Sequence, residues 1–443
     1  MPVSAQTINE NLKFSATTGP AALSPVATSG TTVIVGDYAD SEAASQAGSA
    51  YLLNLETGQE LFKLIASDAD VSDKFGWSVA ISGTTAIVGA PFTDDHGNAS
   101  GSVYLFDTET GLEIAKLTAS DASEADLFGW SVAISGTIAI VGAKYDDRND
   151  RGIDDNAGSA YLFDIETGKE LFKLTASDTW YQAEFGESVA ISETSAIIGV
   201  PNDPFNRSGA AYLFDIQTGQ EISKLIPSDG NNDSDGFGLS VAISDTTAIV
   251  GAQYDRNTTS GGFRITGSAY LFDVQTGQEL FKLTASDAAP SDNFGASVAV
   301  SGTTAIVGAQ QSDHSAFNSG AAYEFDVETG AQNFKLVASD GTESDFFGYS
   351  VAIAGRFAVV GAYGGTFDSQ SGIERGSIYV VNFQPCFDNP SDFNGNNVLD
   401  FFDISAFLAA FTTQVQDADL NNDGLYDFFD INVFLTAFSA GCP

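Results

Sequence analysis

A unit of about fifty residues recurs through most of this chain, and a repeat of that length is typical of solenoids, propellers and other arrays. Six copies open on a Phe-Gly pair, which begins at Phe75, Phe128, Phe185, Phe237, Phe294 and Phe347. A further copy without its Phe-Gly lies upstream, where TSGTTVIVGDY at 28–38 matches ISGTTAIVGAP at 81–91. The chain therefore holds seven related units in tandem.

Each unit contains four short runs that alternate in the manner of β-strands. In the copy at 75–121 they are SVAIS (78–82), AIVGA (86–90), SVYLFD (102–107) and LEIAKLTA (112–119), with glycine-containing turns between them. Runs of this length without a helical period predict antiparallel strands, here named A to D in chain order. Four strands repeated seven times predict an all-β fold, a seven-bladed β-propeller.

The two ends of the repeat array complement one another. The last copy supplies only three strands before Pro385. At the other end, ENLKFSATT (10–18) matches the strand D segment ELFKLIASD (60–68), with Lys13 aligned to Lys63. We therefore expect the N-terminal strand to close the last blade, which would remove the open edges of the array.

The Phe-Gly pairs and the VGA segments at 88–90, 141–143, 250–252, 307–309 and 360–362 carry a family resemblance. With them, about residues 10–383 resemble the FG-GAP repeat family, the bacterial relatives of the integrin alpha-subunit propeller. The resemblance implies a binding or adhesion scaffold, although a fold alone does not define a function. Integrin propellers carry Asp-rich calcium loops at the A–B turn of some blades. The tight A–B turns of this chain lack them, so the resemblance does not imply calcium binding by the propeller.

The B–C loops and the D–A links are expected on one face of the disc, and the B–C loops differ most between copies. We take this face as the candidate ligand face, because specificity is commonly built on variable loops. The residue after each Phe-Gly begins the innermost strand there. The aromatic residues at this position, Trp77, Trp130 and Tyr349, are candidates for stacking on a ligand such as a sugar ring, with plain packing as the alternative.

Two charged positions also recur in every unit or nearly so. The D–A links carry Asp68, Asp121, Asp178, Asp229, Asp287 and Asp340. We interpret these aspartates as acceptors for their own loop backbone, with a cation site as the alternative. The outer strands carry Lys13, Lys63, Lys116, Lys173, Lys224, Lys282 and Lys335, which we interpret as charges that discourage pairing between edge strands.

Composition limits the possible partners. The chain of 443 residues has 17 Lys and Arg against 59 Asp and Glu, a net charge of −42, which disfavours nucleic acid and anionic membranes. No apolar run is long enough for a membrane span, and the first 23 residues do not read as a signal peptide. Motifs of hydrolases and nucleotide-binding enzymes are also missing, so a non-catalytic role is expected.

A different duplication fills the C-terminal end, where DFNGNNVLDFFDISAFLAAF (392–411) matches DLNNDGLYDFFDINVFLTAF (419–438). Each copy places oxygen donors at the spacing of an EF-hand calcium loop followed by one helix. The first loop offers Asp392, Asn394, Asn396, Val398 (by its carbonyl), Asp400 and Asp403. The second offers Asp419, Asn421, Asp423, Leu425 (by its carbonyl), Asp427 and Asp430. We therefore expect two bound Ca²⁺ ions.

One helix per loop, with Asp at position 12, resembles a type I dockerin, and the Ala-Gly-Cys-Pro terminus resembles the GC-type dockerin-like modules. Classical dockerins often carry small polar residues at loop positions 10 and 11, which here are Phe401-Phe402 and Phe428-Phe429. Because of that departure, the resemblance does not decide whether the partner is a cohesin. Alternatively, these phenylalanine rings belong to the core of a small domain. Cys386 and Cys442 bracket the module and predict a disulfide, hence an extracytoplasmic location, with two free buried thiols as the alternative.

These observations predict two domains: a propeller at 1–383 and, after a linker at 384–391, a dockerin-like domain at 392–443. The expected function is that of a secreted or cell-surface binding and adhesion protein. In it the propeller recognises an extracellular protein or glycan, and the calcium-dependent module attaches it to a cohesin-like or cell-surface partner. The alternative is a secreted carbohydrate-active hydrolase or lyase that uses the same loop face, since glycoside hydrolysis needs only two carboxylates.

Overall fold

The computed structural model describes residues 12–15, 25–147, 156–178, 181–203, 207–230, 235–259, 262–355, 357–364, 376–382, 393, 401–413, 418, 420 and 425–440. The chain forms two compact units, Met1–Val381 and Asn382–Pro443. Each unit is described by itself.

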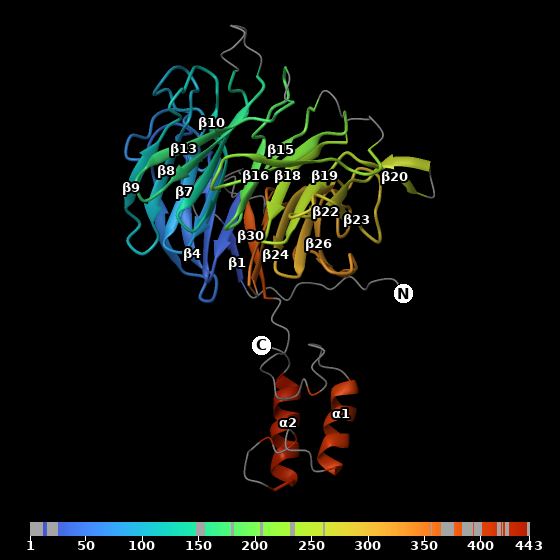
Figure 1. Ribbon diagram of the computed structural model, residues 1–443. Helices are drawn as coiled ribbons and strands as arrows, with labels where there is room; N and C mark the ends of the chain where they lie inside the picture. Colours follow the sequence, from blue (N-terminus) through green and yellow to red (C-terminus); the bar gives the residue numbers. More distant parts are fainter. Residues whose placement is uncertain are drawn as a thin grey trace. The chain divides into compact units, whose positions relative to one another are not determined.

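The first unit is a seven-bladed β-propeller, as the sequence predicted (Figure 1). Blade 1 contains β2 (Val26–Ser29), β3 (Thr32–Asp37), β4 (Ser49–Asn54) and β5 (Glu60–Leu64). Blade 2 contains β6 (Ser78–Ser82), β7 (Thr85–Ala90), β8 (Ser102–Asp107) and β9 (Glu113–Leu117). Blade 3 contains β10 (Phe128–Ser135), β11 (Ile138–Ala143), β12 (Ser159–Asp164) and β13 (Lys169–Leu174). Blade 4 contains β14 (Ser188–Ile191), β15 (Ser195–Val200), β16 (Ala210–Asp215) and β17 (Glu221–Leu225).

The remaining blades follow the same order. Blade 5 contains β18 (Phe237–Ile243), β19 (Thr247–Ala252), β22 (Ser268–Asp273) and β23 (Glu279–Leu283). Its B–C loop folds into a separate hairpin of β20 (Arg256–Thr259) and β21 (Gly262–Ile265). Blade 6 contains β24 (Phe294–Ser301), β25 (Thr304–Ala309), β26 (Ala321–Asp326) and β27 (Gln332–Leu336). Blade 7 contains β28 (Phe347–Ala354), β29 (Phe357–Ala362) and β30 (Ser377–Asn382).

The N-terminal strand closes the ring, which confirms the prediction. Strand β1 (Leu12–Ser15) lies antiparallel to β30 as the outer strand of blade 7, with Lys13 opposite Tyr379 and Phe14 opposite Ile378. Phe14 also packs against the core cluster shared by blades 7 and 1. The first and last strands of the propeller therefore belong to one sheet.

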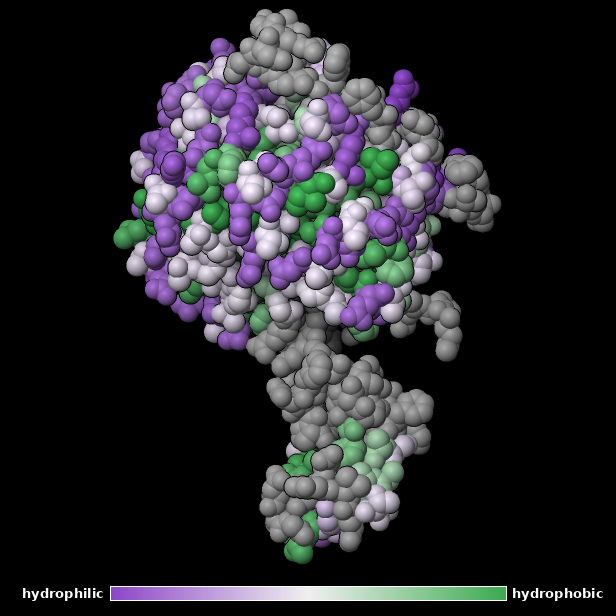
Figure 2. Space-filling model, in the orientation of Figure 1, coloured by the Kyte–Doolittle hydropathy of each residue, from purple (hydrophilic) through white to green (hydrophobic). Residues whose placement is uncertain are grey.

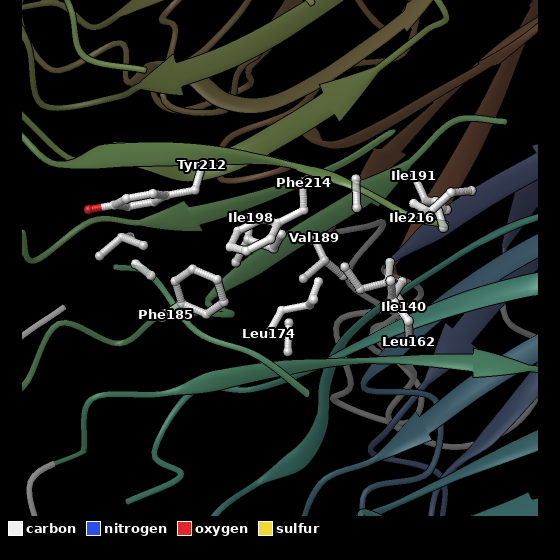
Figure 3. Packing of buried hydrophobic residues seen from close by; sticks show 14 of the residues in the cluster. Ile140, Leu162, Leu174, Phe185, Val189, Ile191, Ile198, Tyr212, Phe214 and Ile216 are labelled. Atoms are coloured by element: carbon white, nitrogen blue, oxygen red, sulfur yellow. The ribbon is translucent and has the colours of Figure 1, made fainter. Parts of the chain in front are cut away.

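The hydrophobic core lies between neighbouring blades. Between blades 3 and 4, Ile140 and Leu162 on one sheet pack with Val189 and Ile198 of the next (Figure 3). Successive apolar residues of an inner strand point to opposite faces, as Ile87 packs in one cluster while Ala86 and Val88 pack in the other. Each sheet therefore presents an apolar face to each of its neighbours. Similar clusters fill other spaces between blades, which explains why every unit repeats the same apolar pattern.

The Phe-Gly pair has a structural role at the start of strand A. Phe128 is fully buried and meets the edges of Tyr161 and Phe163 in the third strand of its blade. The following Gly129 has φ +90°, and a Cβ there would lie 2.7 Å from the carbonyl oxygen of Ser102 in the preceding blade. A left-handed backbone with this close approach favours glycine.

The B–C loop of one blade lies beside the D–A link that follows it. Gly48 forms a parallel bridge with Phe75, and the amide of Phe75 donates to the carbonyl of Ala47 at 2.8 Å. The same bridge recurs at Gly101–Phe128, Gly209–Phe237, Gly267–Phe294 and Gly320–Phe347. The predicted grouping of these two kinds of loop on one face, named here the B–C face, is confirmed.

The second unit contains two helices, α1 (Phe401–Thr412) and α2 (Phe428–Ala440). Their core centres on Phe407 and Phe434, whose rings stack with centroids 4.2 Å apart and an angle of 8°. These two residues are separated by the 27-residue offset of the sequence duplication, as are Ile404 and Ile431 beside them. The duplication therefore pairs equivalent residues across the core. Within the described residues, neither helix has the length and apolar character of a membrane span.

Candidate functional site

A β-bulge places the residue after each Phe-Gly on the B–C face. In blade 3 the register jumps from Phe128 to Ser131, which leaves Trp130 out of the ladder with β11. Blades 5, 6 and 7 have the same shift, and Tyr349 holds the corresponding position in blade 7. Bulges of this kind redirect a side chain away from the sheet surface, which explains how a strand residue reaches the loop face.

The structure brings the three predicted ligand residues into one group through two tyrosines that the sequence analysis missed. Tyr349 stacks on Tyr363 from the B–C loop of its own blade, with centroids 5.2 Å apart. Tyr363 forms a side-chain hydrogen bond with Tyr38 of blade 1, and burial together with this bond raises the pKa of Tyr38. Tyr38 in turn lies 5.1 Å from Trp77 of blade 2.

The group continues through the two tryptophans. Trp77 lies 4.7 Å from Trp130 in blade 3 and meets Phe92 edge-on at 5.7 Å. These rings form a continuous strip across four blades, which we name the aromatic arc: Tyr349, Tyr363, Tyr38, Trp77, Phe92 and Trp130. Tyr349 and Tyr363 are 42% and 40% exposed, and the other four are partly buried, so the arc is accessible to a ligand.

A buried ion pair borders the arc in blade 3. The Nζ atom of Lys144 lies 3.4 Å above the ring of Trp130, which is cation–π geometry, and 3.0 Å from a carboxylate oxygen of Glu187. Glu187 occupies the position after Phe-Gly in blade 4. Lys144 covers one face of Trp130 and holds that ring in place.

The position after Phe-Gly is not aromatic in blades 4, 5 and 6. Leu239 of blade 5 and Ala296 of blade 6 occupy the positions held by Trp130 and Tyr349. A group of residues that breaks the repeat is stronger evidence for a ligand site than a feature present in every blade, because the propeller fold alone does not require it. The sequence could have indicated this arc by the tyrosines that follow VGD and VGA at 38 and 363.

The repeated D–A aspartates bind the next blade. Asp121 accepts hydrogen bonds from Tyr161 at 2.9 Å and from Lys173 at 2.6 Å, both in blade 3. The same tie is formed by Asp68, Asp178, Asp229, Asp287 and Asp340, and Asp340 binds Lys13 of β1. Each aspartate also accepts a hydrogen bond from its own backbone, as interpreted from the sequence, but the bonds from Lys and Tyr of the next blade have the larger effect on its carboxylate. The tie occupies their carboxylates and gives no support to a cation site.

The outer-strand lysines complete these ties. Lys173 also lies 2.5 Å from Asp146, a buried residue of its own B–C loop. Lys63, Lys116, Lys224 and Lys282 pair in the same way with Asp40, Asp95, Asp203 and Asp255. Four of the lysines therefore each join a link to a loop: Lys116, Lys173, Lys224 and Lys282. The interpretation of the outer-strand lysines as charges that discourage edge pairing stays a prediction.

The contacts of each D–A aspartate determine the pKa of its carboxyl group. Burial alone would raise the pKa of Asp121, but the hydrogen bonds from Lys173 and Tyr161 outweigh it and hold that pKa below its usual value. A carboxyl whose pKa falls on folding stabilises the protein at every pH above its unfolded pKa of about 4. This stabilisation should disappear as the pH falls through the lowered pKa of the folded state.

We expect Lys173→Met to cost about 3 kcal/mol at neutral pH, because it leaves the buried carboxylate of Asp146 without its cation. Lys169→Met, at the exposed start of the same strand, is the matched control and should cost little. Urea unfolding of the two variants measures the difference. Equal stabilities would show that the tie contributes nothing.

A second set of hydrogen bonds, which the sequence analysis did not predict, also joins outer strands to the preceding D–A link. Glu113 of β9 accepts the amide and hydroxyl of Ser67 in the preceding link, at 2.9 and 3.0 Å. Glu170, Glu221 and Glu279 bind Ser120, Ser177 and Ser228 in the same way. These glutamates explain the acidic residue that begins most outer strands.

Several buried carboxyl groups have raised pKa values. Burial raises the pKa of Asp126 to about 7, with Asp146 adding to the rise, and that of Asp73 and Asp292 to about 6. Each lies two residues before a Phe-Gly pair and accepts an amide three residues earlier. Because the arrangement repeats from blade to blade, it does not single out a catalytic pair for the hydrolase or lyase alternative.

Among the described residues, no cluster of three or more acidic, His or Cys side chains is arranged to hold a metal.

Only part of the predicted calcium site lies within the described residues. Leu425, Asp427 and Asp430 are described, whereas Asp392, Asn394, Asn396, Val398, Asp400, Asp419, Asn421, Asp423 and the Asp403 side chain fall outside them. Asp427 accepts the amide of Phe429 at 2.8 Å, and Asp430 accepts the amide of Asp427 at 3.0 Å. This reciprocal pair caps the start of α2. Asp430 is fully buried, and a buried carboxylate with a second one beside it fits a bound cation.

The core role considered for the loop phenylalanines is wrong for Phe429, whose side chain is 64% exposed. The side chains of Phe401, Phe402 and Phe428 lie outside the described residues, as do Cys386 and Cys442 with their predicted disulfide.

The fold and the loop face together define a β-propeller scaffold of the binding and adhesion type. The family model described as "FG-GAP repeat" matches residues 59–106, 112–163, 169–214, 220–272, 278–325 and 331–381. The chain therefore belongs to the FG-GAP repeat family, as the Phe-Gly pairs indicated. No curated protein matches the chain. Among solved structures, the crystal structure of the computationally designed Ika8 protein matches at a TM-score of 0.48 and 16% identity, covering 83% of this chain and 98% of that one.

Proposed function

We propose that this protein is an extracellular, non-catalytic binding protein whose ligand site is the aromatic arc on the B–C face. The carrying observation is that the arc joins residues from four consecutive blades and breaks the sevenfold repeat. Ring faces held in place by their neighbours offer a large contact area at little cost in conformational entropy. Such a strip suits the flat faces of sugar rings or the side chains of an extracellular protein.

The C-terminal unit is proposed to be a dockerin-like attachment module that holds two Ca²⁺ ions. Asp427 and Asp430 would bind the second ion with the other donors of that loop, and bound calcium would neutralise carboxylates crowded at the start of α2. The partner of the module would be a cohesin-like or cell-surface protein. Exposed Phe429 and Leu435 offer it apolar contacts.

The extracellular location rests on the cysteine pair as well as on the family. Peptide mapping without reduction should find Cys386 joined to Cys442 in protein secreted by its host. Recovery of two alkylatable thiols would contradict both the pairing and the location.

The proposed ligand face is tested by screening the full-length protein against extracellular glycans and proteins, with and without Ca²⁺. A ligand of the propeller should lose at least tenfold in affinity in the double variant Tyr349→Ser, Tyr363→Ser, because both rings are exposed and stack only on each other and their neighbours. Leu112→Ser is the control, since Leu112 is 67% exposed on the opposite C–D turn. Binding that survives the tyrosine changes would place the site elsewhere.

A further inference from the structure

Two tyrosines of the aromatic arc stack on each other in blade 7. Tyr349 lies in β28 and Tyr363 directly follows β29, and their ring centroids are 5.2 Å apart with an angle of only 26° between the ring planes. Nearly parallel, offset rings at this distance bring carbon atoms of the two phenols into van der Waals contact. Among the described residues, no other pair of tyrosine rings stacks in this way.

The backbone holds both tyrosines against the same D–A link. The amide of Tyr349 donates to the carbonyl of Phe346 at 3.0 Å, and the amide of Gly364, directly after the second tyrosine, donates to the carbonyl of Asp345 at 3.0 Å. A Cβ at Gly364 would lie 1.8 Å from the carbonyl oxygen of Ser344, so only glycine allows the loop to approach the link so closely. The contact between the two rings is therefore set by the backbone on both sides.

A hydrogen bond also fixes the direction of the second ring. Tyr363 is hydrogen-bonded through its side chain to Tyr38 of blade 1, and the ring of Tyr38 in turn lies 5.1 Å from that of Trp77. The oxygen end of Tyr363 is thus held by one neighbour while its ring face lies on Tyr349. The two phenols meet without a change of rotamer in either residue.

Exposure to solvent alone does not distinguish this pair. Four tyrosines are exposed among the described residues: Tyr181 at 50%, Tyr254 at 43%, Tyr349 at 42% and Tyr363 at 40%. Within the part of the chain that the structure describes, neither Tyr181 nor Tyr254 contacts a second tyrosine ring. Tyr349 and Tyr363 therefore combine access from solvent with contact between two phenols.

We propose that Tyr349 and Tyr363 form a modification site, at which one-electron oxidation joins the two rings in a dityrosine cross-link. The oxidant is hydrogen peroxide acting through a haem peroxidase, which removes one electron from one phenol at a time. The proposal goes beyond the proposed function, because it does not depend on which ligand the arc binds.

The reaction needs no other group of the protein. Each phenol loses one electron and its hydroxyl proton, which gives two phenoxyl radicals. The radicals pair to form one carbon–carbon bond between ring carbons ortho to the oxygens, and the two ortho hydrogens then move to the oxygens as the rings regain aromaticity. The product has lost two hydrogen atoms in total, and their electrons and protons reduce one hydrogen peroxide to two water molecules.

The arrangement favours coupling within one molecule. Rings that are already in contact react without the cost of a diffusional encounter, whereas phenols of two molecules must first meet. The new bond would tie β28 to the loop after β29 in blade 7, the blade that β1 closes. It would turn two separate side chains at the end of the aromatic arc into one rigid unit.

The test treats the dilute full-length protein with a haem peroxidase and hydrogen peroxide and then isolates the monomer. Trypsin cleaves after Arg356, which lies between the two tyrosines in the sequence, so their peptides separate unless the rings are joined. We expect peptides 336–356 and 357–375 as one linked species that lacks two hydrogen atoms and shows the blue fluorescence of dityrosine.

Two variants assign the cross-link to this pair. Tyr349→Phe and Tyr363→Phe each keep a ring in the stack and remove one phenol, so each should lower the yield of the cross-link in the monomer at least about tenfold. Tyr254→Phe is the matched control, because it removes an equally exposed phenol that has no tyrosine beside it, and the yield should not change. Circular dichroism and melting curves confirm that the variants remain folded.

Three results would overturn the proposal. They are dityrosine found only in dimers of the protein, a fluorescence of the monomer that is unchanged in Tyr349→Phe, and oxidation that consumes tyrosine without joining these two peptides. None of them bears on the ligand site, which the loss of binding in the Tyr349→Ser, Tyr363→Ser variant tests separately.

Discussion

Deleting residues 1–18 should destabilise the whole propeller, with a loss of roughly 5 kcal/mol in the free energy of unfolding. The deletion removes the ladder between β1 and β30, the packing of Phe14 and the contacts of Lys13 with Asp340 and Tyr379. It also exposes the edge of β30 and opens the ring. Blade 7 would then have only three strands. It would also lose the strand that continues along the chain into blade 1.

Thermal unfolding followed by circular dichroism measures this effect. Deletion of residues 1–9 is the matched control, because it leaves β1 and the aligned segment 10–18 intact, and it should melt like the full chain. Lys13→Met is an intermediate case that keeps the strand and removes only its ion pair. If the 1–18 deletion melts as one transition at the temperature of the full chain, closure by β1 does not stabilise the ring.

The second large effect concerns calcium. A chelator should abolish the helical signal of the C-terminal unit, because the free loops would concentrate carboxylates without a compensating charge and binding energy becomes folding energy. The second loop should bind more tightly, since Asp419, Asp423, Asp427 and Asp430 give it four carboxylates against three in the first, with Gly424 at its turn.

Calorimetry on the full chain with Asp430→Ala or Asp403→Ala separates the two sites. Asp430→Ala should remove the tighter phase and Asp403→Ala the weaker one. Asp427→Asn is a milder change that retains an oxygen acceptor for the amide of Phe429, so it tests the ion more than the helix cap. A tighter phase lost with Asp403→Ala, or a helical signal unchanged by chelator, would contradict this account.

The strands and the closure of the ring were predictable because the repeat encodes them several times. The match of Lys13 to Lys63 was enough to place β1 on blade 7. The partners of the repeated Asp and Lys were not predictable, because they join one blade to the next across 46–53 positions of sequence, and a single unit contains no sign of its neighbour. The sequence shows that the Asp and Lys positions repeat, but it does not show which residue of the next blade each one contacts.

The same limit applies to the candidate site. Trp77, Trp130 and Tyr349 could be identified because they follow Phe-Gly. Their union into one arc depends on Tyr38 and Tyr363, which come from opposite ends of the propeller and meet only because the ring closes. Figure 2 shows small apolar patches lying among hydrophilic residues on the propeller's visible side.

Closure by the first strand also has a consequence for synthesis in the cell. Among the described strands, Leu12–Ser15 is made first, but its partner Ser377–Asn382 is made last. Blades 1 to 6 are each continuous in sequence and can form as they emerge, whereas the N-terminal strand must wait for nearly the whole propeller. During that interval blade 1 has no neighbour on one side. The face of blade 1 that packs against blade 7 therefore stays uncovered until blade 7 has been made.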